Sequence, residues 1–125
     1  MSKEVKKILV VDDEKDLIET LKYRLEDAGY IVLVALDGLE GLEKAKEFVP
    51  DIILLDIMMP RMDGYQACRA LKHDSGTKHI PVVILTAKGQ EIDKQKAKEA
   101  GADGYIVKPF EGKDLIKKLN EFLKV

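Results

Sequence analysis

Cysteine and long apolar runs are both scarce in this 125-residue chain. Cys68 is the single cysteine, so an internal disulfide and a metal site made of several thiolates are excluded. The first apolar run, Ile8 to Val11, is far shorter than the roughly 7–15 residues of a secretory core or the about 20 residues of a membrane span. We therefore expect a cytoplasmic protein that does not bind a membrane.

Neither sign of charge is in large excess, because 21 Lys and Arg residues face 23 Asp and Glu residues and the formal net charge is -2. Acidic residues lie near the lysine pairs at 6–7 and 117–118, so the sequence has no clustered basic stripe of the kind that binds nucleic acid. The hydrophobic share of 46% and the charged share of 35% indicate a soluble, folded chain. We expect residues 1–125 to form one domain.

Several catalytic signatures are also missing. The chain has no Walker loop, no Gly-x-Gly-x-x-Gly after the first apolar run, no His-Glu-x-x-His and no Gly-x-Ser-x-Gly. His73 and His79 lie in a polar stretch and are expected to be solvated. Cys68 is expected to be a small buried apolar group on a helix rather than a reactive thiol.

Short apolar runs rich in β-branched residues alternate with segments of helical period. The runs predict strands at 7–11, 31–35, 51–55, 81–85 and 105–107. A helix is predicted after each strand: Gly29 closes the first, Asp37 and Glu40 open the second with capping-box spacing, and Gly101 ends the fourth.

Five strand–helix units indicate an α/β domain with a parallel sheet that helices cover on both faces. Right-handed crossovers leave few layouts, and we predict the flavodoxin-like, doubly wound strand order 2-1-3-4-5. The fourth helix, expected over 91–100, offers only Ile92, Ala97 and Ala100 to the core. Thin packing makes this helix either a moving part or simply a polar surface helix.

Polar residues stand at the ends of four predicted strands, namely Asp12 and Asp13, Asp56, Thr86 and Lys108. Because ligands bind beyond the carboxyl ends of parallel strands, we expect these residues to share one rim of the sheet. Each has an ordinary alternative: Asp13 as a helix cap, Asp56 as a turn residue, Thr86 as a polar strand end and Lys108 as a solvated lysine. Only their convergence indicates a site.

Electrostatics indicates what such a site would hold. Three carboxylates about 5 Å apart repel by on the order of 10 kcal/mol in total at an effective dielectric constant of about 20. Lys108 supplies one positive charge and a divalent cation two. Ligands that are all oxygen favour Mg²⁺, with Mn²⁺ as a substitute. A carboxylate beside that ion can act as a nucleophile toward phosphorus, while Thr86 and nearby backbone N–H groups neutralise the phosphoryl oxygens.

With these residues in view, the chain resembles the receiver domain of two-component response regulators, particularly the chemotaxis-regulator type. The resemblance covers essentially the whole chain and is carried by ILVVDDE at 8–14, LDIMMPRMDG at 55–64, ILTA at 84–87 and GADGYIVKPF at 101–110.

The resemblance implies that Asp56 is the phosphoacceptor. The side chains of Asp13 and Asp56 and the backbone carbonyl of Met58 would bind Mg²⁺, with Asp12 assisting directly or through water. Lys108 would pair with Asp56 and later with its phosphate.

The resemblance also implies a switch. Thr86 would move to hydrogen-bond the phosphate, the amides of Ile57 and Ala87 would hold its other oxygens, and Tyr105 would swing inward. The face formed by the fourth helix, fifth strand and fifth helix would change and bind a downstream protein. Such a protein is a phosphoryl-accepting signalling switch, a phosphoprotein that catalyses only its own phosphorylation and dephosphorylation.

The phosphoryl donor of such a switch would be a sensor histidine kinase or a histidine phosphotransfer protein. The resemblance leaves a stand-alone regulator, a phosphorelay intermediate and a receiver cut from a longer regulator open; we favour the stand-alone form without an effector domain, as a monomer or a weak phosphorylation-dependent dimer. The alternative function is a Mg²⁺-dependent aspartyl phosphohydrolase. Such enzymes usually carry a second acid two residues after the nucleophile, where this chain has Met58. A nucleotide or flavin carrier is disfavoured by the acidic rim and the missing glycine-rich loop.

Overall fold

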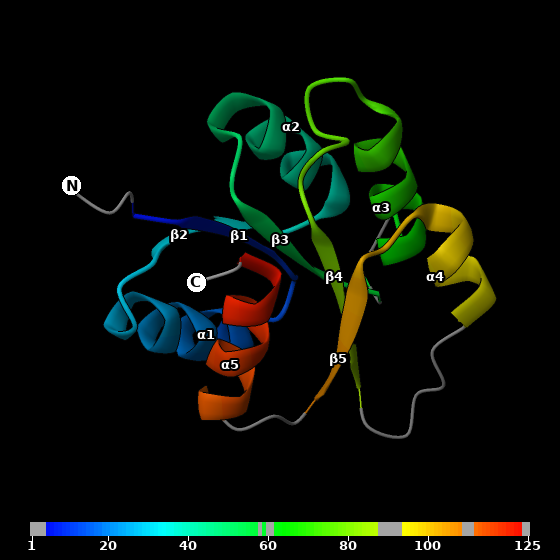
Figure 1. Ribbon diagram of the computed structural model, residues 1–125. Coiled ribbons are helices and arrows are strands. Elements are labelled where there is room, and N and C mark those ends of the chain that lie inside the picture. The colour runs from blue at the N-terminus through cyan, green and yellow to red at the C-terminus, as the bar shows by residue number, and fades with distance from the viewer. Residues whose placement is uncertain (1–4, 58, 60–61, 88–93, 109–111, 124–125) are drawn as a thin grey trace.

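The computed structural model describes residues 5–57, 59, 62–87, 94–108 and 112–123. Strands and helices alternate along these residues, as Figure 1 shows. The strands are β1 (Lys7–Val11), β2 (Ile31–Ala35), β3 (Ile52–Asp56), β4 (Val82–Ala87) and β5 (Gly104–Lys108). The helices are α1 (Lys15–Asp27), α2 (Gly38–Phe48), α3 (Gly64–His73), α4 (Lys94–Ala100) and α5 (Gly112–Leu123).

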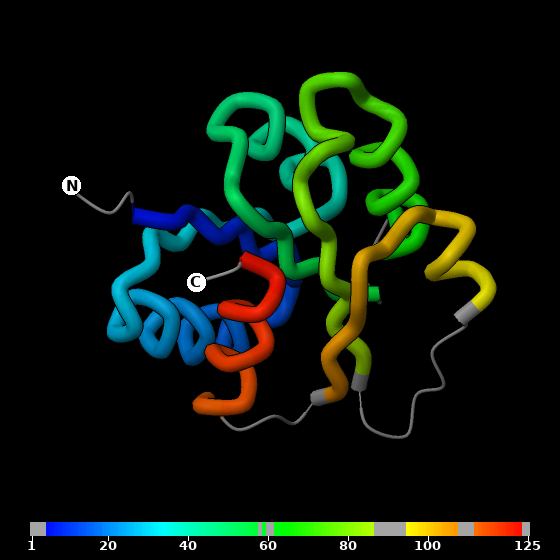
Figure 2. The backbone as a smooth tube through the Cα atoms, in the orientation of Figure 1, coloured from blue at the N-terminus to red at the C-terminus, as the bar shows by residue number. Residues whose placement is uncertain are grey.

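The strands form one parallel sheet in the order β2-β1-β3-β4-β5, which confirms the predicted doubly wound, flavodoxin-like topology. The backbone trace in Figure 2 shows that each crossover passes through a helix before the chain returns to the sheet. Helices α1 and α5 lie on one face, and α2, α3 and α4 lie on the other (Figure 1). No helix within the described ranges has the length and apolarity that crossing a membrane requires.

Two hydrophobic cores fill the spaces between the sheet and its helices. Because side chains alternate across a strand, a central strand with helices on both faces must be apolar throughout. All of β3 is buried, and its neighbour β1 alternates between the two cores in the same way. Strand β4 contributes to both cores and, through Ile84, to a third, smaller cluster with Ile57 and Ala97. The first core contains Ile8, Val10, Leu54, Leu85 and Leu119; the second contains Leu9, Val11, Ile53, Leu55 and Leu71.

The helix ends largely follow the sequence signals. Gly29 and Gly101 have φ angles of 98° and 86° and follow α1 and α4, as predicted for helix stops. The Asp37 side chain accepts a hydrogen bond from the Glu40 amide at 2.9 Å, which confirms the cap of α2. The capping box itself is incomplete, because the Glu40 carboxylate accepts from the amide of Leu36 at 2.5 Å instead of from Asp37.

Three strands, β3, β4 and β5, end later than the sequence predicted, β5 by one residue at Lys108. Strand β3 includes Asp56 and strand β4 continues through Thr86 to Ala87, whereas the predicted strands ended at 55 and 85. The apolar period stops before these polar residues, but the ladder continues because Asp56 still pairs with Leu85 and Thr86 with Val107. Both residues are therefore held by the sheet itself rather than by a loop after it.

Helix α4 is described from Lys94 onward, so Ile92 lies outside the described residues. In the part that is described, the buried side chains are those of Ala97 and Ala100, which are 9% and 2% exposed. Two small side chains bury little apolar area, so the prediction of thin packing holds for this part of the helix.

Candidate functional site

Three carboxylates meet at the carboxyl ends of β1 and β3. Asp12 and Asp13 follow β1, and Asp56 ends β3, the strand that pairs directly with β1. One carboxylate oxygen of each lies within 4.8 Å of the others, so the structure brings together the three acids that the sequence singled out. Asp12 and Asp56 are buried, with 1% and 7% exposure, whereas Asp13 is exposed. Two acids of the cluster are therefore buried at the edge of the sheet, and the cluster is open to solvent at Asp13.

Backbone contacts hold Asp12 in place. Its amide donates to the carbonyl of Ala35 at 3.0 Å, which ties it to the end of β2. Its Oδ1 accepts a hydrogen bond from the Glu14 amide at 3.0 Å. Glu14 is the N-cap residue of α1 and makes no side-chain cap, so the interpretation of Asp13 as a helix cap is wrong. The Asp13 carboxylate remains on the acidic rim instead.

Thr86 brings a hydroxyl to the same rim from β4. It is 1% exposed, and its Oγ1 has no hydrogen-bond partner among the described residues. Ile84, two residues earlier on the strand, packs with Ile57 and Ala97, so Thr86 points to the face that α4 covers. A buried hydroxyl without a partner costs on the order of 1–3 kcal/mol. Such a group indicates that the site is completed by a partner that is not among the described residues.

Tyr105 lies on β5 opposite Ile84, and Val107 lies opposite Thr86. Tyr105 is 38% exposed, so its ring lies at the surface and is not packed in the core. Thr86 and Tyr105, the two residues that the resemblance implies for the switch, thus lie on adjacent strands and are two residues apart in register. The Tyr105 side chain lies on the outside.

The chain turns directly after Asp56. Ile57 is buried, its amide donates to the Leu85 carbonyl at 3.3 Å, and its carbonyl accepts from the Gly64 amide at 2.9 Å. The predicted role of this amide as a phosphate donor therefore requires it to leave or share the Leu85 carbonyl, which the long 3.3 Å contact makes easy.

Some predicted site residues lie outside the description. Met58 is outside the described residues. Lys108 pairs through its backbone with Ala87 on β4, but the side chains of both residues are outside the description. Cys68 and the two histidines are described: Cys68 is buried, as predicted, and His73 and His79 are exposed.

Gly64 is a site neighbour whose importance the sequence analysis missed. It follows Asp63, the N-cap residue of α3, which forms a complete capping box with Gln66. Gly64 also lies against the backbone of Asp56, where a Cβ atom would be 2.5 Å from the Asp56 carbonyl oxygen. The available signal was a glycine at the first position of a helix, where a side chain is normally tolerated.

Comparisons with known proteins agree with this geometry. The family model for the response regulator receiver domain matches residues 8–120. The chain is 43% identical over 119 residues to the alkaline phosphatase synthesis transcriptional regulatory protein PhoP of Bacillus subtilis, covering 95% of this chain and 49% of PhoP. It is 41% identical over 110 residues to the protein PilG of Pseudomonas aeruginosa, covering 88% of this chain and 82% of PilG. The chain thus spans about half the length of PhoP and most of the length of PilG.

Solved structures show the same fold. The chemotaxis protein CheY4 of Vibrio cholerae matches with a TM-score of 0.89 and 37% identity over 95% of this chain and 99% of CheY4. The receiver domain of the sensor histidine kinase PA1611 of Pseudomonas aeruginosa, whose structure has a magnesium ion coordinated in the active site cleft, matches with a TM-score of 0.89 and 28% identity over 98% and 100% of the two chains. The chain belongs to the receiver domain family of response regulators, the phosphoryl-accepting switches of two-component signalling.

Proposed function

We propose that Asp56 is the residue that accepts the phosphoryl group, in a reaction that depends on Mg²⁺. The observation that carries this assignment is the meeting of Asp12, Asp13 and Asp56 within 4.8 Å beside the buried hydroxyl of Thr86, which has no partner among the described residues. Of the three acids, Asp56 lies on the strand next to the one that bears Thr86. An acyl phosphate on Asp56 would therefore form between the other two acids and the Thr86 hydroxyl.

The donor set fits Mg²⁺. Its ligand atoms are carboxylate oxygens, and Mg²⁺ prefers a few such oxygens together with water and phosphate oxygens. We assign Asp13 and Asp56 as direct ligands, the Met58 carbonyl as a further one, and Asp12 as a direct or water-mediated ligand, with Mn²⁺ as a substitute. The bound ion would offset the charge of the carboxylates and of the phosphoryl oxygens. The magnesium ion in the PA1611 receiver domain supports this assignment.

The transfer step is a displacement at phosphorus. A carboxylate oxygen of Asp56 attacks the phosphorus of a phosphohistidine, an O–P bond forms and the P–N bond breaks. The donor imidazole leaves with the electron pair and takes up a proton. Thr86 donates its hydroxyl hydrogen to a phosphoryl oxygen, the amides of Ile57 and Ala87 hold the others, and Lys108 pairs with the new anion. The same site would later hydrolyse the acyl phosphate.

The resulting signal would be read on the face formed by α4, β5 and α5. When Thr86 bonds the phosphate, the space that it leaves admits the ring of Tyr105. Tyr105 and Val107 are 38% and 47% exposed on β5, so burying the tyrosine changes the surface that a downstream protein would bind. Coupling of this kind typically amounts to about 1–3 kcal/mol, which is enough to shift a population between two forms. The histidine kinase or phosphotransfer donor, the cytoplasmic location and a weak phosphorylation-dependent dimer stay predictions.

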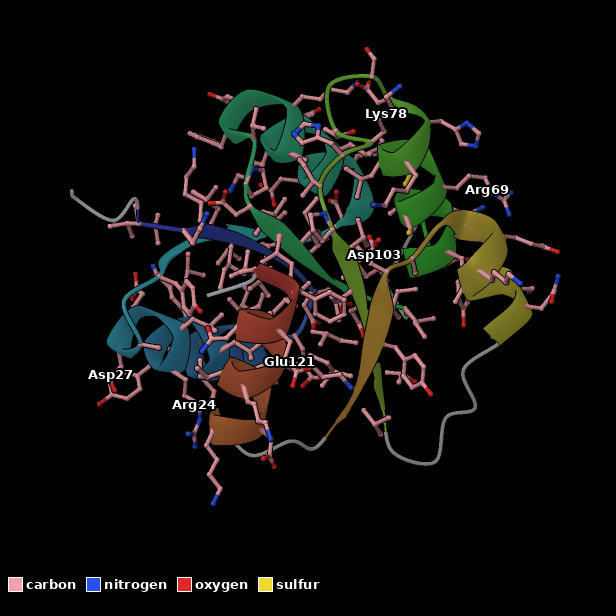
Figure 3. The ribbon with its side chains drawn as sticks, in the orientation of Figure 1. Arg24, Asp27, Arg69, Lys78, Asp103 and Glu121 are labelled. Atoms are coloured by element: carbon pink, nitrogen blue, oxygen red, sulfur yellow. The ribbon has the colours of Figure 1, made fainter. Side chains whose placement is uncertain are left out.

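The experiment is a labelling assay with Mg²⁺ and acetyl phosphate. The wild type should gain one phosphate per chain, stable to acid and labile to base, and Asp56→Asn should abolish it. Asp27→Asn is the matched control, because Asp27 is an exposed acid at the far end of α1 (Figure 3). Chelating the Mg²⁺ should also abolish labelling.

Two other outcomes would replace the proposal. Continuous release of many phosphates per chain would favour the aspartyl phosphohydrolase. A wild type that takes up no phosphate would reject both functions for this site.

A further inference from the structure

We propose that Gly64 is a positioning residue for phosphoryl transfer, because its missing side chain leaves room for the peptide group that joins Asp56 to Ile57. The inference rests on the proposed function of Asp56 and extends it to a residue that contributes no polar side chain. Helix α3 starts beside the carboxyl end of β3 (Figure 1).

The start of α3 is fixed from both sides. The Asp63 side chain accepts from the Gln66 amide at 2.9 Å, and the Gln66 side chain accepts from the Asp63 amide at 3.0 Å. The Gly64 amide donates to the Ile57 carbonyl at 2.9 Å, which ties the helix to the turn after Asp56. The helix therefore cannot move away from β3 without losing the hydrogen bond between Gly64 and Ile57.

At Gly64 the contact is with backbone and not with a side chain. A Cβ there would lie 2.5 Å from the Asp56 carbonyl oxygen, 2.8 Å from the Ile57 Cα and 3.1 Å from the Asp56 carbonyl carbon. At Gly41 and Gly104 the nearest atoms belong to the side chains of Val11 and Phe122. Side chains can rotate away from an added methyl group, whereas the end of a central strand can only be displaced.

Displacing this carbonyl would move a proposed phosphate ligand. The Asp56 carbonyl and the Ile57 N–H belong to one planar peptide group, so they turn together. The carbonyl faces Gly64, and the N–H faces the Leu85 carbonyl of β4 at 3.3 Å. The Ile57 N–H must turn from the Leu85 carbonyl to reach the phosphoryl oxygen that it is proposed to hold, so a methyl group that displaces this peptide group would disturb that turn. Removing one preorganised donor of this kind typically lowers a rate about 10²–10³-fold, and a shift of about 1 Å can lower it about 10²-fold.

The test compares Gly64→Ala with Gly104→Ala and the wild type. Gly104→Ala is the matched control, because its Cβ would also meet an atom at 2.5 Å, the Cζ of Phe122, at the opposite end of the sheet from Asp56. The maximal rate of labelling by acetyl phosphate is measured at saturating Mg²⁺, together with Mg²⁺ affinity, thermal unfolding and the NMR shift of the Ile57 amide upon phosphorylation.

Gly64→Ala should lower the maximal rate at least about tenfold and reduce the response of the Ile57 amide. Its Mg²⁺ affinity should change less than the rate, because two of the proposed ligands, Asp12 and Asp13, follow β1 and not β3. The maximal labelling rate of Gly104→Ala should stay within about twofold of the wild-type rate, even where this variant loses as much stability as Gly64→Ala.

Equal rates for the two variants, with a labelled wild type, would overturn the inference alone. So would a Gly64→Ala protein that does not fold, because Gly64 would then serve the fold as a whole. A wild type that is not labelled would overturn the proposed function and this inference with it.

Discussion

Aspartate side chains are arranged differently at the amino and the carboxyl ends of the strands. At the amino ends, each of two aspartates forms a pair of backbone hydrogen bonds with the first residue of a neighbouring strand. The Lys7 amide donates to the Asp51 carboxylate at 2.7 Å, and the Asp51 amide donates to the Lys7 carbonyl at 2.8 Å. The same arrangement joins Val82 to Asp103, with both bonds at 2.8 Å. Each carboxylate thus supplies an acceptor to a strand-starting amide.

The Asp103 arrangement includes a lysine as well. Lys72 of α3 lies 2.8 Å from the Asp103 carboxylate and donates to the Ile80 carbonyl at 2.7 Å. Figure 3 shows Asp103 where β5 begins, next to α3. Helix α3, the start of β4 and the segment before β5 are therefore joined by one group of contacts within the protein.

At the carboxyl ends the acids approach one another, and one of them, Asp12, also accepts a hydrogen bond from the Glu14 amide. Asp12, Asp13 and Asp56 converge within 4.8 Å, and the Thr86 hydroxyl has no hydrogen bond among the described residues. Carboxylates thus bind the first residue of a neighbouring strand at the amino ends, whereas three of them converge at the carboxyl ends, where we propose that Mg²⁺ binds. Removing an acid at the carboxyl ends should therefore raise the free energy of unfolding while it impairs the proposed function. Removing an acid at the amino ends should lower the free energy of unfolding.

The largest effect is expected for Asp56→Asn without Mg²⁺. Two unit charges 4.8 Å apart repel by about 3 kcal/mol at an effective dielectric constant of about 20. The substitution should therefore raise the free energy of unfolding at pH 7 by about 2–3 kcal/mol. Urea unfolding at low salt measures this, and adding Mg²⁺ should shrink the gain because it stabilises the wild type more. A lower free energy of unfolding for Asp56→Asn than for the wild type would contradict the expected repulsion among the three acids.

At the other end, Asp103→Ala should lower the free energy of unfolding by about 2 kcal/mol, because the Val82 amide loses its acceptor and Lys72 loses its anion. Asp103→Asn serves as the control, since it keeps an oxygen for Val82 but no charge for Lys72. Denaturant unfolding should rank the wild type above Asp103→Asn and Asp103→Asn above Asp103→Ala. Equal stability of all three proteins would show that the Asp103 contacts with Val82 and Lys72 do not stabilise the fold.

The smallest effect at neutral pH concerns Cys68, beside the Lys72–Asp103 pair. Burial raises the pKa of its thiol to about 11 from an ordinary 9.0; Lys72 opposes this rise and Asp103 adds to it. Because the folded pKa lies above the unfolded one, the stability from the neutral thiol is complete below pH 9 and is lost as the pH rises through 11. The stability difference between wild type and Cys68→Ala should be constant from pH 7 to about 8.5 and fall above that. A difference that is independent of pH throughout would contradict the burial of this thiol.

Elements and strand order could be predicted because they depend on a pattern along the chain. The apolar runs of β1 and β3 and the stops at Gly29 and Gly101 are local signals, and each is confirmed. The ends of β3 and β4 could not be predicted, because the polar residues Asp56 and Thr86 break the apolar period while ladder pairing continues. The acids of the rim were predicted to converge, since the carboxyl ends of parallel strands share one edge.

The amino-end aspartates were missed for a physical reason. Asp51 was assigned to a strand and Asp103 to a family block, and neither carries a local sign of its partner. Their partners, Lys7 and Val82, lie on neighbouring strands and are chosen by the register of the sheet.

The sequence by itself determined the parallel α/β architecture and the acids at the strand ends, because periodicity and residue type act locally and directly on the backbone. Tertiary structure alone decided which carboxylates bind the first residue of a neighbouring strand and which converge at the rim. It also decided that Gly64 lies against the carbonyl of Asp56. These features depend on close approaches between distant segments, which packing fixes to fractions of an ångström and no local pattern records.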